Sequence, residues 1–406
     1  MLNDTSLRAC TQYVLDQTRH VIETIGVRPP GSAAERKSQE YIREELRASC
    51  DTEPFLEEFP VAPKAFMSFQ PIMGALLLGA MVAYWFYPAT AFLLSTLALF
   101  VYLTEFVQYR EMLDVFFPKQ ISCNVGAYQR PAGEVKRRFI INAHPDGAYE
   151  WRYHYHWPKQ FKFIILYSLA SSAFVFATNV AAIKNDWSGG YQGVWLVVGL
   201  LQLLCVPALI SAFFYTNFKV TVPGANDNLS GCFIALGVLK HMREAGVQLQ
   251  HTELGVLITG SEEAALRGAK AFARKHPRDF DDVETIFITL DTFRDLEHFM
   301  VVGRDLNALV RHDRAVCELL QNAGDAAGHP LPLGKIPLGA SDAAAFTQGG
   351  YRAAALAAMD PAPADFYHTR RDNWDNMNPE CIRACVEVVV EAIRQYDEKG
   401  LPFTVV

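Results

Sequence analysis

Five short stretches of the sequence place histidines and carboxylates in polar turns. They are "AHPDG" with His144 and Asp146, "GANDNLSG" with Asp227, "GSEEAALRG" with Glu262 and Glu263, "TLDT" with Asp291, and "YHTRRDNWDN" with His368 and Asp372. Each stretch alone has an ordinary interpretation as a buried core histidine, a turn that caps a helix, or an exposed helix start. Together they supply the nitrogen and oxygen ligands that divalent metal ions bind.

These residue types match what a pair of neighbouring metal ions needs. Each imidazole can bind one ion, one carboxylate can bridge both, and further carboxylates complete the sites while leaving a position for water. A metal-bound water then becomes a hydroxide nucleophile near neutral pH. One member of the adjacent pair Glu262 and Glu263 would take the proton of that water and pass it to a leaving amine. A carboxylate such as Asp146 would hold a histidine ligand in one tautomer.

The elements that must position these residues alternate between strands and helices. Apolar runs rich in β-branched residues predict strands at 137–144, 252–260 and 284–291, and an edge strand is expected at 55–61. The stretch 227–246 is typical of an amphipathic helix that begins in a polar turn. Since sites in open α/β sheets form at the carboxyl ends of strands, the polar turns are expected to meet there. The predicted fold is α/β, with a mostly parallel mixed sheet and helices on both faces.

Four apolar segments are long enough to cross a bilayer, which takes about 20 residues. They are nearly free of charge and come in two pairs, 66–87 with 89–107 and 161–183 with 194–215. They predict two transmembrane hairpins, whereas core helices of a soluble domain are the weaker alternative. The expected organisation is one α/β domain interrupted twice, with the domain at 1–65, 108–160 and 216–406 and the hairpins at 66–107 and 161–215.

The charges that flank the spans predict which side of the membrane holds the α/β domain. Basic residues lie on that side at Lys64, Arg110, Arg152, Lys159, Lys162 and Lys219. The hairpin tips carry only Lys184, which is close to Asp186. The positive-inside rule therefore places the domain in the cytoplasm, and the aromatic run 151–157 is expected at the membrane interface. The polar start of the chain and the absence of a CxxC pair agree with that side.

The amino-acid composition limits the classes of molecule that the protein is expected to bind. Half of the residues are hydrophobic, and the net charge is −7 without a long basic run, which argues against nucleic acid. A lipid bilayer and a peptide substrate are the expected partners. A transporter is disfavoured because the spans hold few polar residues, and four helices leave little room for a path unless the chain forms a homo-oligomer.

In their order along the chain, these motifs resemble metallopeptidase family 28, the co-catalytic di-zinc aminopeptidases. The resemblance covers nearly everything outside the hairpins. It runs from "IGVRPPGSAAERKSQEYIREEL" through "AHPD", "GANDNLSG", "GSEEAALRG", "LD" and "GASDAAAF" to "YHTRRDNWDN". It implies two Zn²⁺ ions and five ligands, with Asp227 as the bridge. The remaining ligands would be Glu263 with His368 at one ion and His144 with Asp291 at the other.

The resemblance also implies roles for residues beside the ligands. Glu262 would be the general base, Asp146 would orient His144, and Asn228 would follow Asp227 across a peptide bond that is often cis in the family. Two departures stand out: Ala343 occupies a position where many relatives have histidine, and the second hairpin replaces a short connection before Asp227.

The expected function is that of an integral-membrane di-zinc exopeptidase, an aminopeptidase acting on peptides near the membrane. The complete ligand set argues against the silent, transferrin-receptor-like branch of the family and against the single-zinc glutaminyl cyclases. The alternatives that stay open are a carboxypeptidase or other amide hydrolase of the same family, and a catalytically silent membrane receptor or scaffold.

Overall fold

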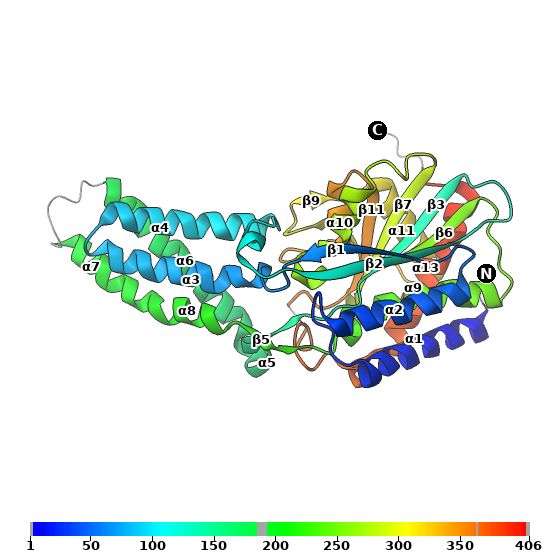
Figure 1. The fold of residues 1–406 in the computed structure, drawn as a ribbon, viewed down its shortest axis with the longest axis horizontal. Coiled ribbons are helices and arrows are strands. Elements are labelled where there is room, and N and C mark those ends of the chain that lie inside the picture. Colours follow the sequence, from blue (N-terminus) through cyan, green and yellow to red (C-terminus); the bar gives the residue numbers. More distant parts are fainter. Residues whose placement is uncertain (1–2, 185–192, 363, 403–406) are drawn as a thin grey trace. The chain divides into compact units, whose positions relative to one another are not determined.

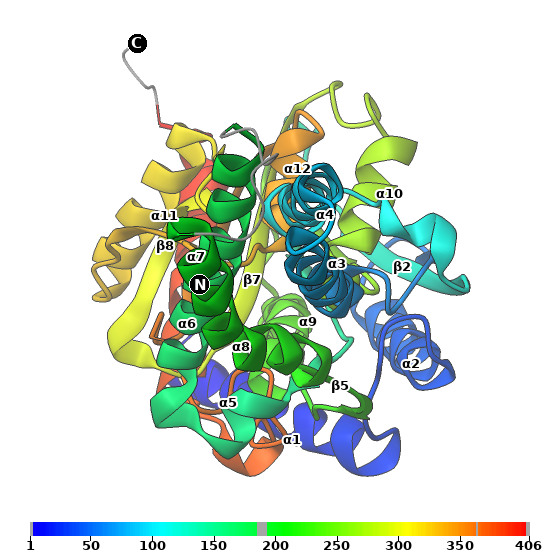
Figure 2. The ribbon, with the colours of Figure 1, turned by 90° about the vertical axis from the view of Figure 1, so that its left-hand side faces the viewer.

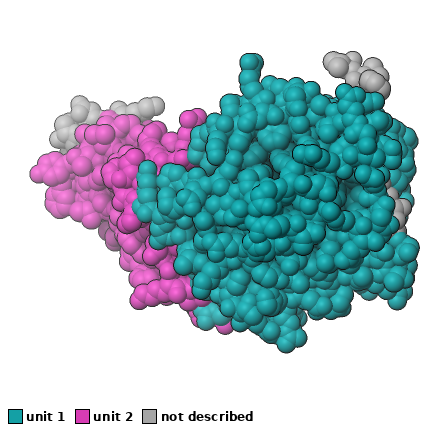
Figure 3. Space-filling view, turned by 45° about the vertical axis from the view of Figure 1, so that its right-hand side comes forward, with its two compact units in different colours: residues 1–63, 119–148, 221–406 teal, residues 64–118, 149–220 magenta. Residues whose placement is uncertain are grey.

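The computed structural model describes residues 3–184, 193–362 and 364–402. The chain divides into two compact units, coloured separately in Figure 3. Unit 1 comprises 1–63, 119–148 and 221–406, and unit 2 comprises 64–118 and 149–220. Residues 108–118 and 149–160, which the sequence assigns to the α/β domain, therefore fall in unit 2. The tip of the second hairpin, with Asp186, lies outside the described residues.

Unit 1 is built on a nine-stranded sheet within the described residues, shown in Figure 1. Its order is β1-β2-β6-β3-β7-β11-β8-β10, with β9 paired to β8. The strands are β1 (Phe55–Val61), β2 (Gln120–Gln129), β3 (Arg137–Ala143), β6 (Thr252–Ile258), β7 (Glu284–Phe293), β8 (Phe299–Asp305), β9 (Val310–Arg311), β10 (Leu333–Lys335) and β11 (Arg352–Ala358). The central strands β6, β3, β7 and β11 are parallel, whereas β2 and β8 run antiparallel to their central neighbours.

Helices cover both faces of this sheet because successive side chains of a strand point to opposite faces. Ile286 and Ile288 of β7 belong to the large core that also contains side chains of α9, α11 and α13. Phe287 points to the other face, where its ring lies 6.3 Å from that of Phe272 in α10 and 4.8 Å from that of Phe346 in α12. The helices of unit 1 are α1 (Asp4–Thr24), α2 (Ala33–Ser49), α9 (Ser230–Glu244), α10 (Arg267–Lys275), α11 (Arg314–Ala327), α12 (Asp342–Gln348) and α13 (Pro379–Lys399). The prediction of an α/β fold with a mixed sheet and helices on both faces is confirmed, and its parallel pairing is concentrated in the centre.

Unit 2 is mostly helical. Its elements are α3 (Phe69–Tyr84), α4 (Pro88–Val101), α5 (Arg152–His156), α6 (Pro158–Lys184), α7 (Val194–Gln202) and α8 (Val206–Ser211), with the paired strands β4 (Tyr149–Trp151) and β5 (Thr216–Thr221). Figure 2 shows α3 and α4 side by side, and α6 also contacts both of them. In the described residues, four helical stretches are long and apolar enough to cross a membrane: Phe66–Tyr84, Pro88–Val107, Pro158–Ile183 and Val194–Phe214.

The helices of unit 2 keep many apolar side chains on the outside. Their buried apolar side chains form small clusters, one of which includes Leu77, Met81 and Val175. Large apolar side chains are exposed on every stretch, among them Phe100, Phe163, Leu166, Leu200 and Leu204. In α5, just before α6 begins, His154 is buried and its ring lies 4.5 Å from that of Phe161, within a group of aromatic rings that includes Trp151 and Tyr215.

Candidate metal centre

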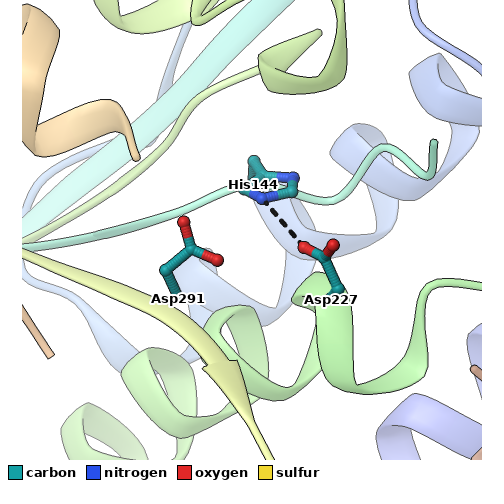
Figure 4. A group of neighbouring side chains, drawn as sticks. All are labelled: His144, Asp227 and Asp291. Atoms are coloured by element: carbon teal, nitrogen blue, oxygen red, sulfur yellow. Dashed lines mark ion pairs between the residues drawn. The ribbon is translucent and has the colours of Figure 1, made fainter. Parts of the chain in front are cut away.

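The carboxyl end of the parallel sheet brings the five expected ligands into two groups. His144 follows β3, Asp291 lies near the end of β7, and Asp227 precedes α9, so three separate segments converge in Figure 4. The second group contains Asp227 again, together with Glu263 after β6 and His368 after β11. Within each group, one nitrogen or oxygen atom per residue lies within 4.8 Å of the others. Asp227 is common to both groups.

The two oxygens of Asp227 face different histidines. Oδ1 lies 3.5 Å from His144 Nε2, the contact drawn as a dashed line in Figure 4. Oδ2 lies 3.2 Å from His368 Nε2, and the same nitrogen lies 3.2 Å from Glu263 Oε2. The two oxygens of one carboxylate thus face the two ligand groups, which is the arrangement that a bridging ligand requires.

Glu262 and Asp146 lie beside the ligand groups, outside both. Glu262 Oε2 is 3.7 Å from His144 Nε2. Asp146 Oδ1 is 3.3 Å from His144 Nδ1, and the two oxygens of Asp146 accept hydrogen bonds from the backbone N–H groups of Glu262 (3.1 Å) and Glu263 (3.0 Å). Asp146 therefore connects the histidine turn to the glutamate turn.

The backbone around Asp227 is held from two sides. Asp372, which the sequence singled out without a role, accepts hydrogen bonds from the backbone N–H of Asn226 (2.8 Å) and of Asp227 (3.0 Å). Asn228 donates from Nδ2 to the carbonyl oxygen of Leu290 in β7 at 2.7 Å. The Asp227–Asn228 peptide bond is cis, as expected from the resemblance. The position of the shared carboxylate is thereby tied to the same strand that carries Asp291.

The electrostatics of this cluster suit divalent cations. Burial raises the pKa of Glu262 and of Glu263 well above the ordinary value, and the charge of Asp227 adds to the shift of Glu263. Burial and the neighbouring Asp227 raise the pKa of Asp291 to about 7. Glu263 Oε1 is buried and has no hydrogen-bond partner among the described residues. Buried carboxylates that resist ionisation and leave an oxygen unsatisfied fit a pair of metal ions, and the histidine and carboxylate set fits zinc.

The family comparison agrees with this geometry. Residues 212–393 match the model of peptidase family M28. This range contains Glu262 and four of the five expected ligands, and the turn after β3 adds His144 and Asp146. The match supports a peptidase of family M28, whereas no curated protein matches the chain.

Solved structures show the same fold along almost the whole chain. One is BSAP, a zinc aminopeptidase from Bacillus subtilis, with 14% identity, a TM-score of 0.57, and coverage of 95% of this chain and 94% of that one. Another is a Zn-dependent exopeptidase from Parabacteroides distasonis, with 13% identity, a TM-score of 0.57, and coverage of 97% and 99%. A third is a glutaminyl cyclase from Bacteroides thetaiotaomicron, with 12% identity, a TM-score of 0.56, and coverage of 94% and 97%. At such identities the likeness concerns the fold. Together with the family match, it supports a zinc-dependent metallopeptidase.

Three buried residues at this M28-like site were not predicted as site residues from residue types and spacing. Asp342 begins α12 and accepts a hydrogen bond from the hydroxyl of Thr259, directly after β6. Arg28 comes from the segment between α1 and α2, Glu35 comes from the first turn of α2, and both are fully buried. Their only sequence signal is their place inside "GVRPPGSAAE" and "GASDAAAF", the motifs that carry the family resemblance. Ala343, where many relatives have histidine, is also buried.

Proposed function

We propose that this chain is a di-zinc exopeptidase, an aminopeptidase whose catalytic domain is anchored in a membrane by the helices of unit 2. The observation that carries the proposal is the pair of ligand groups that share Asp227. His144 and Asp291 would hold one ion, and Glu263 and His368 the other. When bound, two zinc ions lower the pKa of a water molecule and polarise the carbonyl group under attack.

The side chains beside the ligands would transfer the proton of the attacking water and fix the tautomer of the histidine ligand. Glu262 lies against His144 and belongs to neither ligand group, so its carboxylate is available as general base. Burial raises the pKa of Glu262, which suits a group that must hold a proton and then give it to the leaving amine. Asp146 faces Nδ1 of His144 and would keep the proton on that nitrogen, which leaves Nε2 free for the metal.

The choice of an aminopeptidase rests on the fold neighbours, two of which are described as aminopeptidases. Other neighbours are glutaminyl cyclases, so cyclisation of an N-terminal glutamine is the second candidate reaction. Both reactions begin at the N-terminus of a peptide, and the same experiment separates them.

The membrane proposal rests on the exposed apolar surface of unit 2. Between 17% and 39% of the residues in the most apolar window of each of the four stretches are buried, so most of their side chains are at least partly exposed. Outward apolar surface on four stretches of this length fits contact with lipid. The basic residues that flank the spans, such as Lys64 and Lys219, would lie on the cytoplasmic side with the catalytic domain. Such a site would favour hydrophobic or membrane-associated peptides.

The deciding experiment incubates the full-length, zinc-loaded protein with a mixed peptide library and identifies the products by mass spectrometry. We expect loss of single residues from free N-termini. Glu262→Gln should lower the rate by about 10²–10⁴-fold at unchanged zinc content, because a general base is lost and no ligand is. The matched control is Glu40→Gln on the exposed side of α2, which should act like the wild type. Trimming from C-termini would make the enzyme a carboxypeptidase, loss of ammonia from N-terminal glutamine would make it a cyclase, and no reaction with no bound zinc would indicate a silent receptor.

A further inference from the structure

The segment 26–35, "GVRPPGSAAE", contains two ionisable side chains that are fully buried, Arg28 and Glu35. Burying a charge is costly unless its polar atoms find partners. Neither residue has a part in the mechanism proposed above. The partners that they do find all lie in the turns that carry the expected metal ligands, or in the segment itself and β2 beside it.

Arg28 joins the turn of His144 to the turn of Asp227. Its Nε donates to the carbonyl oxygen of Pro145 at 2.6 Å, and its Nη2 donates to the carbonyl oxygen of Pro223 at 2.6 Å. Pro145 lies between His144 and Asp146, and Pro223 lies shortly before Asp227. The guanidinium group is planar and its donors are fixed relative to one another, so it sets the distance between the two carbonyl groups.

Close packing of the two turns leaves room for little else. A side chain at Gly147 would place its Cβ 2.7 Å from the carbonyl oxygen of Val222. At Gly224, where φ is +64°, a Cβ would lie 2.7 Å from the carbonyl oxygen of Asp227 and 3.1 Å from Arg28 Nη2. The turns therefore meet backbone to backbone, and Arg28 is the side chain that bonds to both.

Glu35 holds the third turn. Its Oε1 accepts a hydrogen bond from the backbone N–H of Ser261 at 2.6 Å, directly before Glu262 and Glu263. Its Oε2 accepts from the backbone N–H of Gly31 at 2.6 Å and from the hydroxyl of Ser122 at 2.9 Å. Ser261 has a φ of 54°, a left-handed conformation that is uncommon for residues other than glycine and that needs such support.

We infer that residues 26–35 form a clamp that sets the spacing of the three metal-ligand turns, with Arg28 and Glu35 as its positioning residues. The inference rests on the proposed di-metal site. It adds a segment that sets the geometry of the ligands without being a ligand itself. Arg28 also places a fixed positive charge among the acidic side chains. Burial lowers the pKa of Arg28 to about 10, so it stays charged at neutral pH.

The test titrates the metal-free full-length protein with Co²⁺ and records stoichiometry, affinity and the visible absorption of the bound ion, which reports ligand geometry. Arg28→Lys keeps the positive charge but removes the planar guanidinium group whose two nitrogen atoms bond to the two turns. We expect it to weaken Co²⁺ binding at least tenfold and to alter the absorption bands, because outer partners of ligands typically change metal affinity by about 10–100-fold. Glu35→Gln is the milder variant, since its amide group would face one of two backbone N–H donors, and it should show the same change to a smaller degree.

The matched control is Arg138→Met, at the opposite end of β3, where Arg138 pairs with Glu253 at 2.6 Å. It should lower the melting temperature of the metal-free protein and leave Co²⁺ affinity and absorption unchanged. Wild-type affinity and absorption in both Arg28→Lys and Glu35→Gln would overturn the clamp. A wild-type protein that fails to bind two Co²⁺ ions would instead overturn the proposed function, so the two failures are distinguishable.

Discussion

The carboxylate of Asp146 accepts a hydrogen bond from the backbone N–H of Glu262 over 3.1 Å. This contact joins two turns that are far apart in the sequence, and it sets the proposed base relative to a ligand, because Asp146 also faces Nδ1 of His144. A substitution at Asp146 should therefore affect metal binding and proton transfer together.

Asp146→Asn is expected to lower both zinc affinity and kcat by about 10–100-fold, with a smaller effect on KM. The asparagine amide would turn its N–H₂ group toward one of the two backbone N–H donors or toward His144. Steady-state kinetics and a zinc titration would measure both effects. Asp282→Asn, at an exposed residue beside Arg138, is the control and should behave as the wild type. Unchanged zinc affinity in Asp146→Asn would contradict the role given to this residue.

The shared position of Asp227 predicts unequal losses of metal. His368→Ala should leave one zinc ion per chain, because His144, Asp227 and Asp291 remain together. Asp227→Asn should reduce zinc content at both positions. Metal analysis after gel filtration in buffer free of added zinc would give the two stoichiometries. Equal zinc content in the two variants would argue against a bridging carboxylate.

The metal-free protein should lose stability as the pH rises. Burial raises the pKa of Asp291 to about 7, and burial with the charge of Asp227 raises the pKa of Asp372 to about 7. Between about pH 4 and pH 7 the folded state then binds more protons than the unfolded state, so the free energy of unfolding falls as the pH increases. Melting curves in the presence of a chelator would show this slope.

Zinc should flatten or reverse that dependence, because bound metal requires deprotonated ligands and stabilises only the folded state. Saturation at about a hundred times Kd adds about 2.7 kcal/mol. A metal-free protein whose melting temperature rises from about pH 4 to about pH 7 would contradict the electrostatic account of the cluster.

The membrane orientation can be tested with single cysteines. Tyr87 is 69% exposed at the tip of the first hairpin, and Glu40 is exposed on unit 1. The eight native cysteines are all buried, so background labelling is expected to be low. In intact cells, a membrane-impermeant maleimide should label Tyr87→Cys, whereas Glu40→Cys should react only after permeabilisation. The reverse pattern would place the catalytic domain outside the cytoplasm.

Local sequence signals predicted the elements that carry the site. The expected strands 137–144, 252–260 and 284–291 correspond to β3, β6 and β7, and the expected edge strand is β1. Such runs are recognisable because β-branched composition and polar ends are properties of neighbouring residues. The division of roles among the ligands came from the family resemblance instead.

Hydrogen bonds from side chains to distant backbone groups could not be predicted from the sequence. Arg28 bonds to carbonyl groups 117 and 195 residues away, and Glu35 bonds to an N–H group 226 residues away. A backbone partner has no side-chain identity, so no pattern of residue types points to it. Residues 108–118 and 149–160 cluster with unit 2, yet they are not apolar enough for the sequence to assign them to the hairpins.

The position of β6 in the sheet governs the order in which the protein can be completed during synthesis. β2 and β3 follow each other along the chain, yet β6 lies between them and is made only after both apolar hairpins. His144 therefore leaves the ribosome long before β6, and until β6 is made β2 has one unpaired edge and β3 has two. The second of the two proposed ligand groups is complete only once His368 has emerged, so the proposed hydrolase would stay inactive throughout the period in which the hairpins are being made.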